Sequence, residues 1–135
     1  VMRPELFKVA IPKVGVYDMA KFHDYTIGRF HYDEYGNPGN REDFLAMMSY
    51  SPYHKIKEDV NYPTTLIITS DNDDRVPPVH SYKFAARLQG RPAQINPVYL
   101  KTRRSSGHYG VTTNADEVLQ DESEFYSFLL YHLNK

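Results

Sequence analysis

A short apolar run that leads directly into an acidic turn constrains the fold of this chain more than any other stretch. Within residues 64–81, the run Leu66-Ile67-Ile68 lies between Pro63 and a turn rich in carboxylates. Consecutive apolar residues are typical of a strand buried on both faces of a parallel sheet, because a half-exposed strand alternates apolar and polar positions. The carboxylates that follow are Asp71, Asp73 and Asp74.

The place of this acidic turn favours a functional role, because open α/β sheets hold ligands and catalytic groups just beyond the carboxyl ends of their strands. Aspartate and asparagine are also ordinary residues of turns and helix starts. The turn alone therefore leaves a catalytic and a structural interpretation open.

A histidine flanked by glycines follows the next strand-like run. The run is Pro97-Val98-Tyr99-Leu100, and the histidine stands in Ser106-Gly107-His108-Tyr109-Gly110. The glycines let the backbone bend, so the imidazole can be aimed at a neighbouring strand end. An acid after one strand and a histidine after the next form the second half of the α/β-hydrolase chain order, in which a nucleophile comes first.

Strand-like and helical segments alternate along the chain. The first strand is expected within residues 8–17, where Pro12 should lie at a bulge or near a sheet edge because it has no N–H to donate. Residues 1–7 are interpreted as the tail of a helix and residues 28–41 as an aromatic-rich loop. The alternation predicts an α/β fold with a parallel sheet and right-handed crossovers.

Apolar spacing predicts the helices. They are expected in residues 18–26, around residues 44–51, over residues 78–89, and after the capping pattern Asn114-x-x-Glu117. The apolar stripes of the last two helices are Tyr82, Ala85, Ala86 and Leu88, and then Val118, Phe125, Leu129 and Leu133.

Short motifs spread over nearly the whole chain form a further pattern. They are Arg3-Pro4-Glu5-Leu6-Phe7, Val14-Gly15-Val16-Tyr17-Asp18-Met19, Lys21-Phe22-His23, Tyr25-Thr26-Ile27-Gly28, Asp33 with Glu34-Tyr35-Gly36, Tyr50-Ser51-Pro52, Asp73-Asp74-Arg75-Val76, His80-Ser81-Tyr82-Lys83-Phe84 and Gly107-His108. Together they resemble the C-terminal part of the catalytic domain of prolyl oligopeptidases, a family of serine peptidases.

The resemblance implies the C-terminal portion of an α/β-hydrolase fold, with about three parallel strands and flanking helices. Residues 1–135 would then be part of a peptidase catalytic domain that hydrolyses oligopeptides, with a preference for proline and without a cofactor. None of the serines stands in Gly-x-Ser-x-Gly. We therefore expect the nucleophile-bearing segment to lie upstream of Val1, as it does in the family resembled.

The resemblance also implies roles for three residues near the strand ends. His108 would be the base that takes the proton of the serine hydroxyl, and Asp73 the carboxylate that orients and stabilises its imidazole. Arg75 would hold a substrate carbonyl or carboxyl group, which suits a planar guanidinium with five donors. The alternative for Arg75 is an ion pair with Asp71 or Asp74.

A pocket for a proline ring is implied at Val16, Tyr35 and Val76. The family usually carries a tryptophan four residues before this tyrosine, where the present chain has His31. Imidazole offers less apolar area than indole, so this departure weakens the case for a strict proline preference. Ordinary core packing is the alternative for Val16 and Tyr35.

Composition excludes several other classes of protein and site. The chain has 135 residues, of which 41% are hydrophobic, so it is one domain at most and neither a membrane protein nor a disordered one. A net charge of −1 argues against binding to nucleic acid. Without cysteine, without His-Glu-x-x-His, and without the glycine and glutamate of a calcium loop, the sequence predicts no metal site.

Two functional hypotheses follow. The first is a serine peptidase to which this chain contributes Asp73 and His108, and the second is a non-catalytic binding or interaction domain on the same scaffold. Taken alone, the chain is expected to be inactive and to self-associate through an unpaired strand edge and exposed apolar surface. The sequence leaves the compartment open between cytoplasm and periplasm.

Overall fold

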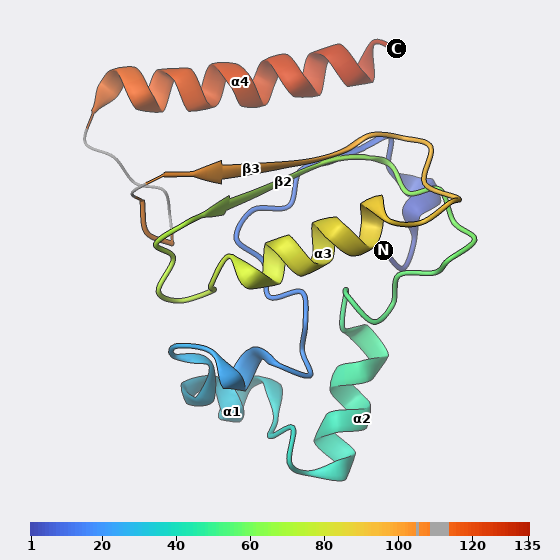
Figure 1. Ribbon diagram of the computed structural model, residues 1–135, viewed down its shortest axis with the longest axis vertical. Coiled ribbons are helices and arrows are strands. Elements are labelled where there is room, and N and C mark those ends of the chain that lie inside the picture. The colour runs from blue at the N-terminus through green and yellow to red at the C-terminus, as the bar shows by residue number, and fades with distance from the viewer. Residues whose placement is uncertain (105, 109–113) are drawn as a thin grey trace.

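Three parallel strands form a sheet that is covered by helix α3 on one face and helix α4 on the other (Figure 1). The computed structural model describes residues 1–104, 106–108 and 114–135. The strands are β1 (Val9–Ala10), β2 (Thr64–Ser70) and β3 (Val98–Arg103), in the order β1-β2-β3. Both pairings are parallel, which confirms the predicted α/β class and the parallel sheet.

Strand β2 is the centre of the sheet because it pairs with both neighbours. Its residues Ile67, Thr69 and Ser70 are almost completely buried, as expected for a strand covered on both faces. Along β3 the pairing runs in unbroken register from Thr65 opposite Val98 to Ser70 opposite Arg103. The two strands therefore end at the same level, and the loops that follow them start side by side.

Strand β1 is much shorter than the predicted strand over residues 8–17. After Ala10, only an isolated bridge between Lys13 and Ile68 continues the pairing. Pro12 lies two residues beyond this edge strand, and its carbonyl accepts a hydrogen bond of 2.9 Å from the Ile68 N–H. Its missing N–H interrupts the ladder, and Val14, with a φ of 43°, turns the chain away from the sheet.

The segments before and after β1 also differ from their predictions. Residues 1–7 hold a single 3-10 turn, Pro4–Leu6, in place of a helix tail. Helical structure in residues 18–26 is limited to the 3-10 turn Phe22–Asp24. The predicted loop over residues 28–41 contains another 3-10 turn, Gly28–His31, and the one-turn helix α1 (Tyr32–Tyr35). Aromatic side chains that pack on one another make this region more compact than its glycines and proline suggest.

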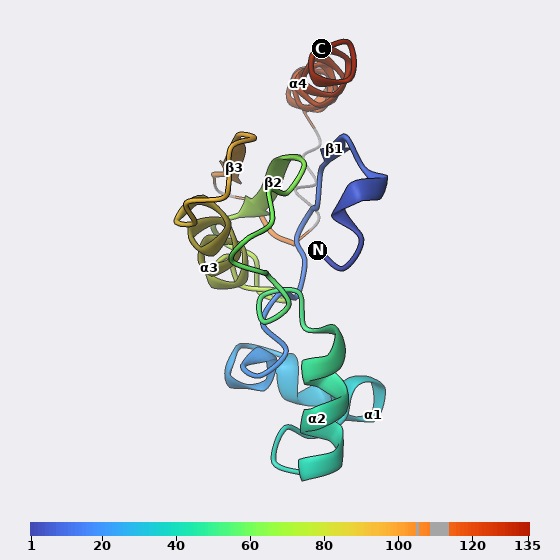
Figure 2. The same cartoon turned by 90° about the vertical axis from the view of Figure 1, so that its right-hand side faces the viewer.

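Helix α2 (Arg41–Tyr50) confirms the helix predicted around residues 44–51, although it begins three residues earlier. The side chain of Asn40 caps its start by accepting hydrogen bonds from the backbone N–H groups of Glu42 and Asp43. Together with α1, it forms a small helical layer at the opposite end of the molecule from α4 (Figure 2).

Helix α3 (Val79–Gln89) confirms the predicted helix, but its buried face is rotated from the expected one. Tyr82 and Ala86 are exposed, so their place in the predicted stripe was wrong. The buried face instead comprises His80, Ser81, Phe84, Ala85 and Leu88. Apolar spacing could not predict this face, because two of its residues, His80 and Ser81, are polar.

Helix α4 (Ala115–Leu133) begins where predicted, with the Asn114 side chain accepting a hydrogen bond from the Asp116 N–H. The predicted burial was wrong for Val118 and Leu133, which are exposed, whereas Phe125 and Leu129 are half-buried. The helix contacts the three-stranded sheet along one side only, which leaves the rest of its apolar surface uncovered.

The described surface predicts that the 135-residue chain self-associates when it is taken alone. Large apolar side chains that are more than half exposed include Met2, Leu6, Phe7, Phe30, Leu45, Ile95, Leu119, Tyr126, Leu130 and Tyr131. Strand β1 lies at a sheet edge, which can pair with another chain. Sedimentation velocity should therefore show dimers or larger species, and replacing Leu6 and Phe7 by lysine should shift them towards monomer. A wild-type chain that stays monomeric at high micromolar concentration and unfolds cooperatively would contradict this expectation.

Candidate active site

Asp73 and His108 lie in contact beyond the carboxyl ends of β2 and β3. The imidazole Nδ1 of His108 is 2.9 Å from Asp73 Oδ2 and 3.0 Å from Oδ1. The carboxylate is completely buried, whereas the imidazole keeps 16% of its surface exposed. The pair can therefore pass a proton to or from a group that reaches the exposed side of the imidazole.

The loop that carries Asp73 also holds its carboxylate in place. Oδ1 accepts hydrogen bonds from the backbone N–H groups of Arg75, at 3.0 Å, and Val76, at 2.8 Å. These two donors compensate for the water that the buried carboxylate has lost. Asp71 and Asp74 of the same loop are exposed. Of the three carboxylates in the turn, only that of Asp73 is both buried and in contact with the histidine.

The five residues predicted to contact substrate line one pocket of about 160 Å³, together with His108. They are Val16, His31, Tyr35, Arg75 and Val76. The structure thus brings together segments that are far apart in the sequence, but their roles towards a substrate stay predictions. Phe22, Ile27, Gly28, Pro77 and His80 complete the lining.

The aromatic wall of this pocket comes from the segment around α1. The rings of His31 and Tyr35 lie 5.7 Å apart at an angle of 32°, and Phe22 packs edge-on against Tyr35 at 5.5 Å. Nδ1 of His31 also lies 3.1 Å from a carboxylate oxygen of Glu34. Burial raises the pKa of the Tyr35 phenol, so its hydroxyl remains protonated near neutral pH.

Arg75 is exposed and lines the same pocket. Its backbone carbonyl accepts a hydrogen bond of 3.2 Å from the Thr26 hydroxyl, which ties its loop to the segment that leads into Ile27 and Gly28. Arg75 is therefore a pocket residue that solvent reaches.

Gly28 is a pocket residue for which the sequence analysis assigned no role. A Cβ atom at this position would stand 1.9 Å from the backbone carbonyl oxygen of Phe22, so no other residue fits without moving that backbone. The glycine stands in the motif Tyr25-Thr26-Ile27-Gly28, which the sequence analysis noted. A lone glycine in a loop does not show which part of the backbone it approaches, so its role could not be predicted.

His80, near the start of α3, is another pocket residue to which the sequence analysis assigned no role. It packs there, with 2% of its surface exposed. Its Nδ1 lies 3.3 Å from the backbone N–H of Asp18, and its ring meets that of Tyr25 edge-on at 5.3 Å. Burial lowers the pKa of His80 from 6.5 to about 4, against a smaller opposing effect of the Asp18 carboxylate.

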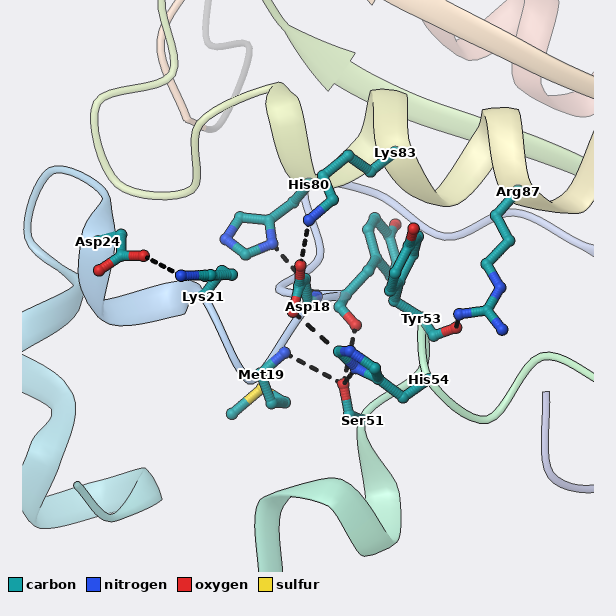
Figure 3. Close-up of polar contacts among 11 residues, drawn as sticks. Asp18, Met19, Lys21, Asp24, Ser51, Tyr53, His54, His80, Lys83 and Arg87 are labelled. Carbon is teal, nitrogen blue, oxygen red and sulfur yellow. Dashed lines mark hydrogen bonds and ion pairs between the residues drawn. The ribbon is translucent and has the colours of Figure 1, made fainter. Parts of the chain in front are cut away.

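Ser51, His54 and Asp18 form a grouping of serine, histidine and aspartate whose members do not line the pocket (Figure 3). Ser51 Oγ is 2.9 Å from His54 Nδ1, and the same nitrogen is 3.9 Å from Asp18 Oδ1. A serine nucleophile needs the histidine to contact the serine and the acid through different nitrogens. Ser51 is also completely buried, and Asp18 is paired with Lys83. This grouping is therefore structural.

Other parts of the described chain offer less for chemistry. Two larger cavities, of about 390 and 630 Å³, are lined mainly by residues of the N-terminal segment and the β2 and β3 starts, without Asp73 or His108. Among the residues that the structure describes, no group of three His, Asp or Glu side chains could hold a metal ion. Within the same residues, no helix combines the length and the apolar character that crossing a bilayer requires.

A buried carboxylate beyond one strand and a histidine beyond the next, beside a pocket, match the acid and histidine of an α/β-hydrolase site. The sequence profile described as the prolyl oligopeptidase family matches residues 1–135. The chain belongs to this family of serine peptidases, which confirms the resemblance seen in its motifs.

Individual relatives support the same conclusion. The prolyl endopeptidase of Elizabethkingia miricola is 42% identical over 133 residues, which cover 98% of this chain and 19% of the relative. The prolyl oligopeptidase dbiP of Dendrothele bispora is 41% identical over 128 residues, which cover 93% of this chain and 17% of the relative. The chain thus spans about a fifth of the length of the curated relatives it matches.

Solved structures agree with the fold. A structure from an analysis of two prolyl endopeptidases has a TM-score of 0.93 at 36% identity and covers 98% of this chain and 19% of its own. Prolyl oligopeptidase B from Galerina marginata, bound to a 35mer hydrolysis and macrocyclization substrate, has a TM-score of 0.86 at 36% identity, covering 94% of this chain and 18% of its own. The fold is therefore that of the corresponding part of a prolyl oligopeptidase catalytic domain.

The lowered pKa of His80 predicts a pH-dependent loss of stability. Unfolded chains take up a proton on this histidine near pH 6.5, but the folded chain does so only near its pKa of about 4. The contribution of His80 is therefore complete above pH 6.5 and is lost as the pH falls towards 4. We expect the free energy of unfolding to decrease by roughly 2 kcal/mol from this residue between about pH 7 and pH 5.

Chemical denaturation at the two pH values is the measurement, with His80→Asn as the matched variant because asparagine does not titrate in this range. The variant should lose less stability than the wild type over the same interval. Equal losses in both proteins would show that His80 does not carry this pH dependence.

Proposed function

We propose that this chain is the acid- and base-bearing part of a serine peptidase that cleaves oligopeptides after proline. The contact between Asp73 and His108, beside a pocket that contains all five predicted binding residues, is the observation that carries this proposal. The serine is contributed by a part of the full-length protein outside these 135 residues, because no serine here stands in Gly-x-Ser-x-Gly. By themselves, these residues are inactive.

The proposed chemistry follows from the different roles of the two ring nitrogens of His108. The Nδ1–H group donates a hydrogen bond to the buried Asp73 carboxylate and keeps its proton, so Nε2 carries the lone pair that accepts the proton of the serine hydroxyl. The serine oxygen then attacks the carbonyl carbon of the scissile bond. Asp73 stabilises the imidazolium that results, and this imidazolium returns the proton to the leaving amine. Water releases the acyl group in a second step that uses the same base.

The pocket supplies the proposed specificity. Val16, Val76 and Tyr35 offer apolar and aromatic surface to a proline ring, and His31 replaces part of the apolar area that an indole would give. Arg75 can donate two parallel hydrogen bonds to a peptide carbonyl or carboxylate that lies over the pocket. Three structures of Galerina marginata prolyl oligopeptidase B, each at least 35% identical to this chain, are bound to a 35mer or 25mer substrate, which supports an oligomeric substrate for this protein.

Replacing the proposed base or acid should abolish activity without unfolding the protein. In the full-length protein, His108→Ala should lower kcat on a chromogenic proline peptide by roughly three to four orders of magnitude. Asp73→Asn should be similarly severe, because an amide favours the wrong imidazole tautomer. The matched controls are His54→Ala, at the exposed histidine that contacts Ser51, and Asp71→Asn, at an exposed acid of the loop that carries Asp73.

Both controls should keep activity within a few-fold of the wild type, since neither side chain lines the pocket. A His108→Ala protein that cleaved the peptide at a near-normal rate would rule out the assignment.

A serine-directed phosphonate separates the peptidase from a non-catalytic binding domain. We expect one covalent adduct on the full-length protein, at a serine outside residues 1–135, because the activated hydroxyl attacks phosphorus as it attacks a carbonyl. Mass spectrometry of the digested protein locates the adduct. An unmodified protein would favour the binding domain, and an adduct at a serine of this chain would overturn the proposed division of the triad.

Arg75→Lys tests the proposed substrate clamp. A lysine ammonium cannot reproduce two parallel hydrogen bonds. KM should therefore rise by about tenfold, and kcat should fall by less than that. If Arg75 instead serves a structural ion pair with Asp71 or Asp74, the Tm of the variant should fall while its kinetics at low temperature stay normal. Steady-state kinetics and thermal unfolding of the same variant distinguish the two roles.

A further inference from the structure

The pocket has two walls that come from distant parts of the sequence. Val16 belongs to the segment that leaves the sheet after β1, whereas Arg75 and Val76 belong to the loop between β2 and α3. No strand pairing joins these segments beyond the Lys13–Ile68 bridge, so within the described residues their spacing depends on side-chain contacts.

Besides the bond from the Thr26 hydroxyl to the Arg75 carbonyl, two such contacts are made by Asp18, two residues after Val16 (Figure 3). Its backbone N–H donates to Nδ1 of His80 at 3.3 Å, and its carboxylate forms an ion pair with Lys83. His80 and Lys83 lie on the first turns of α3, directly after Val76, Pro77 and Pro78. We call Asp18, His80 and Lys83 the brace, because they connect one wall of the pocket to the helix that begins at the other wall.

Hydrogen-bond chemistry fixes the state of His80 in this brace. A backbone N–H can only donate, so Nδ1 must carry a lone pair, and the ring is neutral with its proton on Nε2. A cationic ring would have an N–H at both nitrogens and would repel the Asp18 N–H. The lowered pKa of His80 agrees with this state near neutral pH.

The charged and aromatic groups around His80 hold its imidazole in one position. Lys83 is paired with the Asp18 carboxylate, and this hydrogen bond raises the lysine pKa, so the ammonium stays charged. Tyr25 contacts the imidazole edge-on, and Tyr17 stacks on Phe84 of α3 with ring centroids 4.3 Å apart. His80 itself lines the pocket, so a change at its Nδ1 contact would reach the pocket directly.

We propose that His80 is a positioning residue that sets the width of the substrate pocket, by holding the Asp18 N–H and thereby the Val16 wall against the start of α3. This inference rests on the proposed peptidase function. Without the contact, the two walls can separate, and the pocket discriminates less well between a proline ring and a smaller side chain. The chemical step at His108 does not depend on it.

Three variants of the full-length protein test the brace. His80→Asn keeps an acceptor at the place of Nδ1, His80→Gln places its amide near Nε2, and His80→Phe keeps a ring without any acceptor. We expect His80→Asn to keep KM, and the preference for a proline over an alanine peptide, within about twofold. The other two should raise KM for the proline peptide and reduce the preference by about tenfold, with kcat almost unchanged, because the buried Asp18 N–H loses its acceptor.

The preference ratio separates positioning from general stability, because a structural role alone would lower Tm and leave the ratio unchanged. If His80→Phe fails to fold, Lys83→Gln provides a second test, since it removes the ion pair between Lys83 and the Asp18 carboxylate and should also reduce the preference. Equal behaviour of the Asn and Phe variants would overturn the proposal. A wild-type protein that cleaves neither peptide would instead refute the peptidase function, so the two failures are distinguishable.

Discussion

The parallel pairing of β2 with β3 is the constraint on which the rest of the site depends. Because the two strands stay in register as far as Ser70 and Arg103, their following loops leave the sheet at the same level. Asp73 and His108, which are 35 residues apart, then meet at 2.9 Å. The backbone pairing alone therefore brings the two loops close together. For the same reason, the catalytic groups of open α/β sheets lie at this edge.

Burial of the Asp73 carboxylate is possible because its own loop provides donors. A buried carboxylate without partners would cost several kcal/mol, but two backbone N–H groups and the imidazole satisfy it here. The carboxylate of Asp18 is also buried, but its partner is the ammonium group of Lys83, with which it forms an ion pair. The first arrangement leaves an imidazole with an exposed side, and the second connects two walls of a pocket. Two buried aspartates thus serve different ends because their partners differ.

Much of this arrangement could be predicted from the sequence, and the failures have physical causes. The buried strand β2 and helix α3 follow from a local apolar run and from helix start and stop signals. Chain order predicts an acid near His108, and the family resemblance selects Asp73 among the three carboxylates of the turn. The extent of β1 could not be predicted, since Pro12 and the turn at Val14 act against its apolar pattern. The buried face of α3 was missed because His80 and Ser81 are polar yet face the interior. Gly28 and His80 became recognisable only when tertiary contacts showed what they approach.

The central claim is that the carboxylate of Asp73 holds the Nδ1 proton of His108. Proton NMR of the full-length protein with isotope-labelled histidine observes this proton directly, because a strong hydrogen bond to a buried carboxylate moves an imidazole N–H signal far downfield. The account predicts one such signal in the wild type, retained in His54→Ala and absent from both His108→Ala and Asp73→Ala. A downfield signal that survives Asp73→Ala, or a wild-type spectrum without a signal that depends on His108, would contradict it.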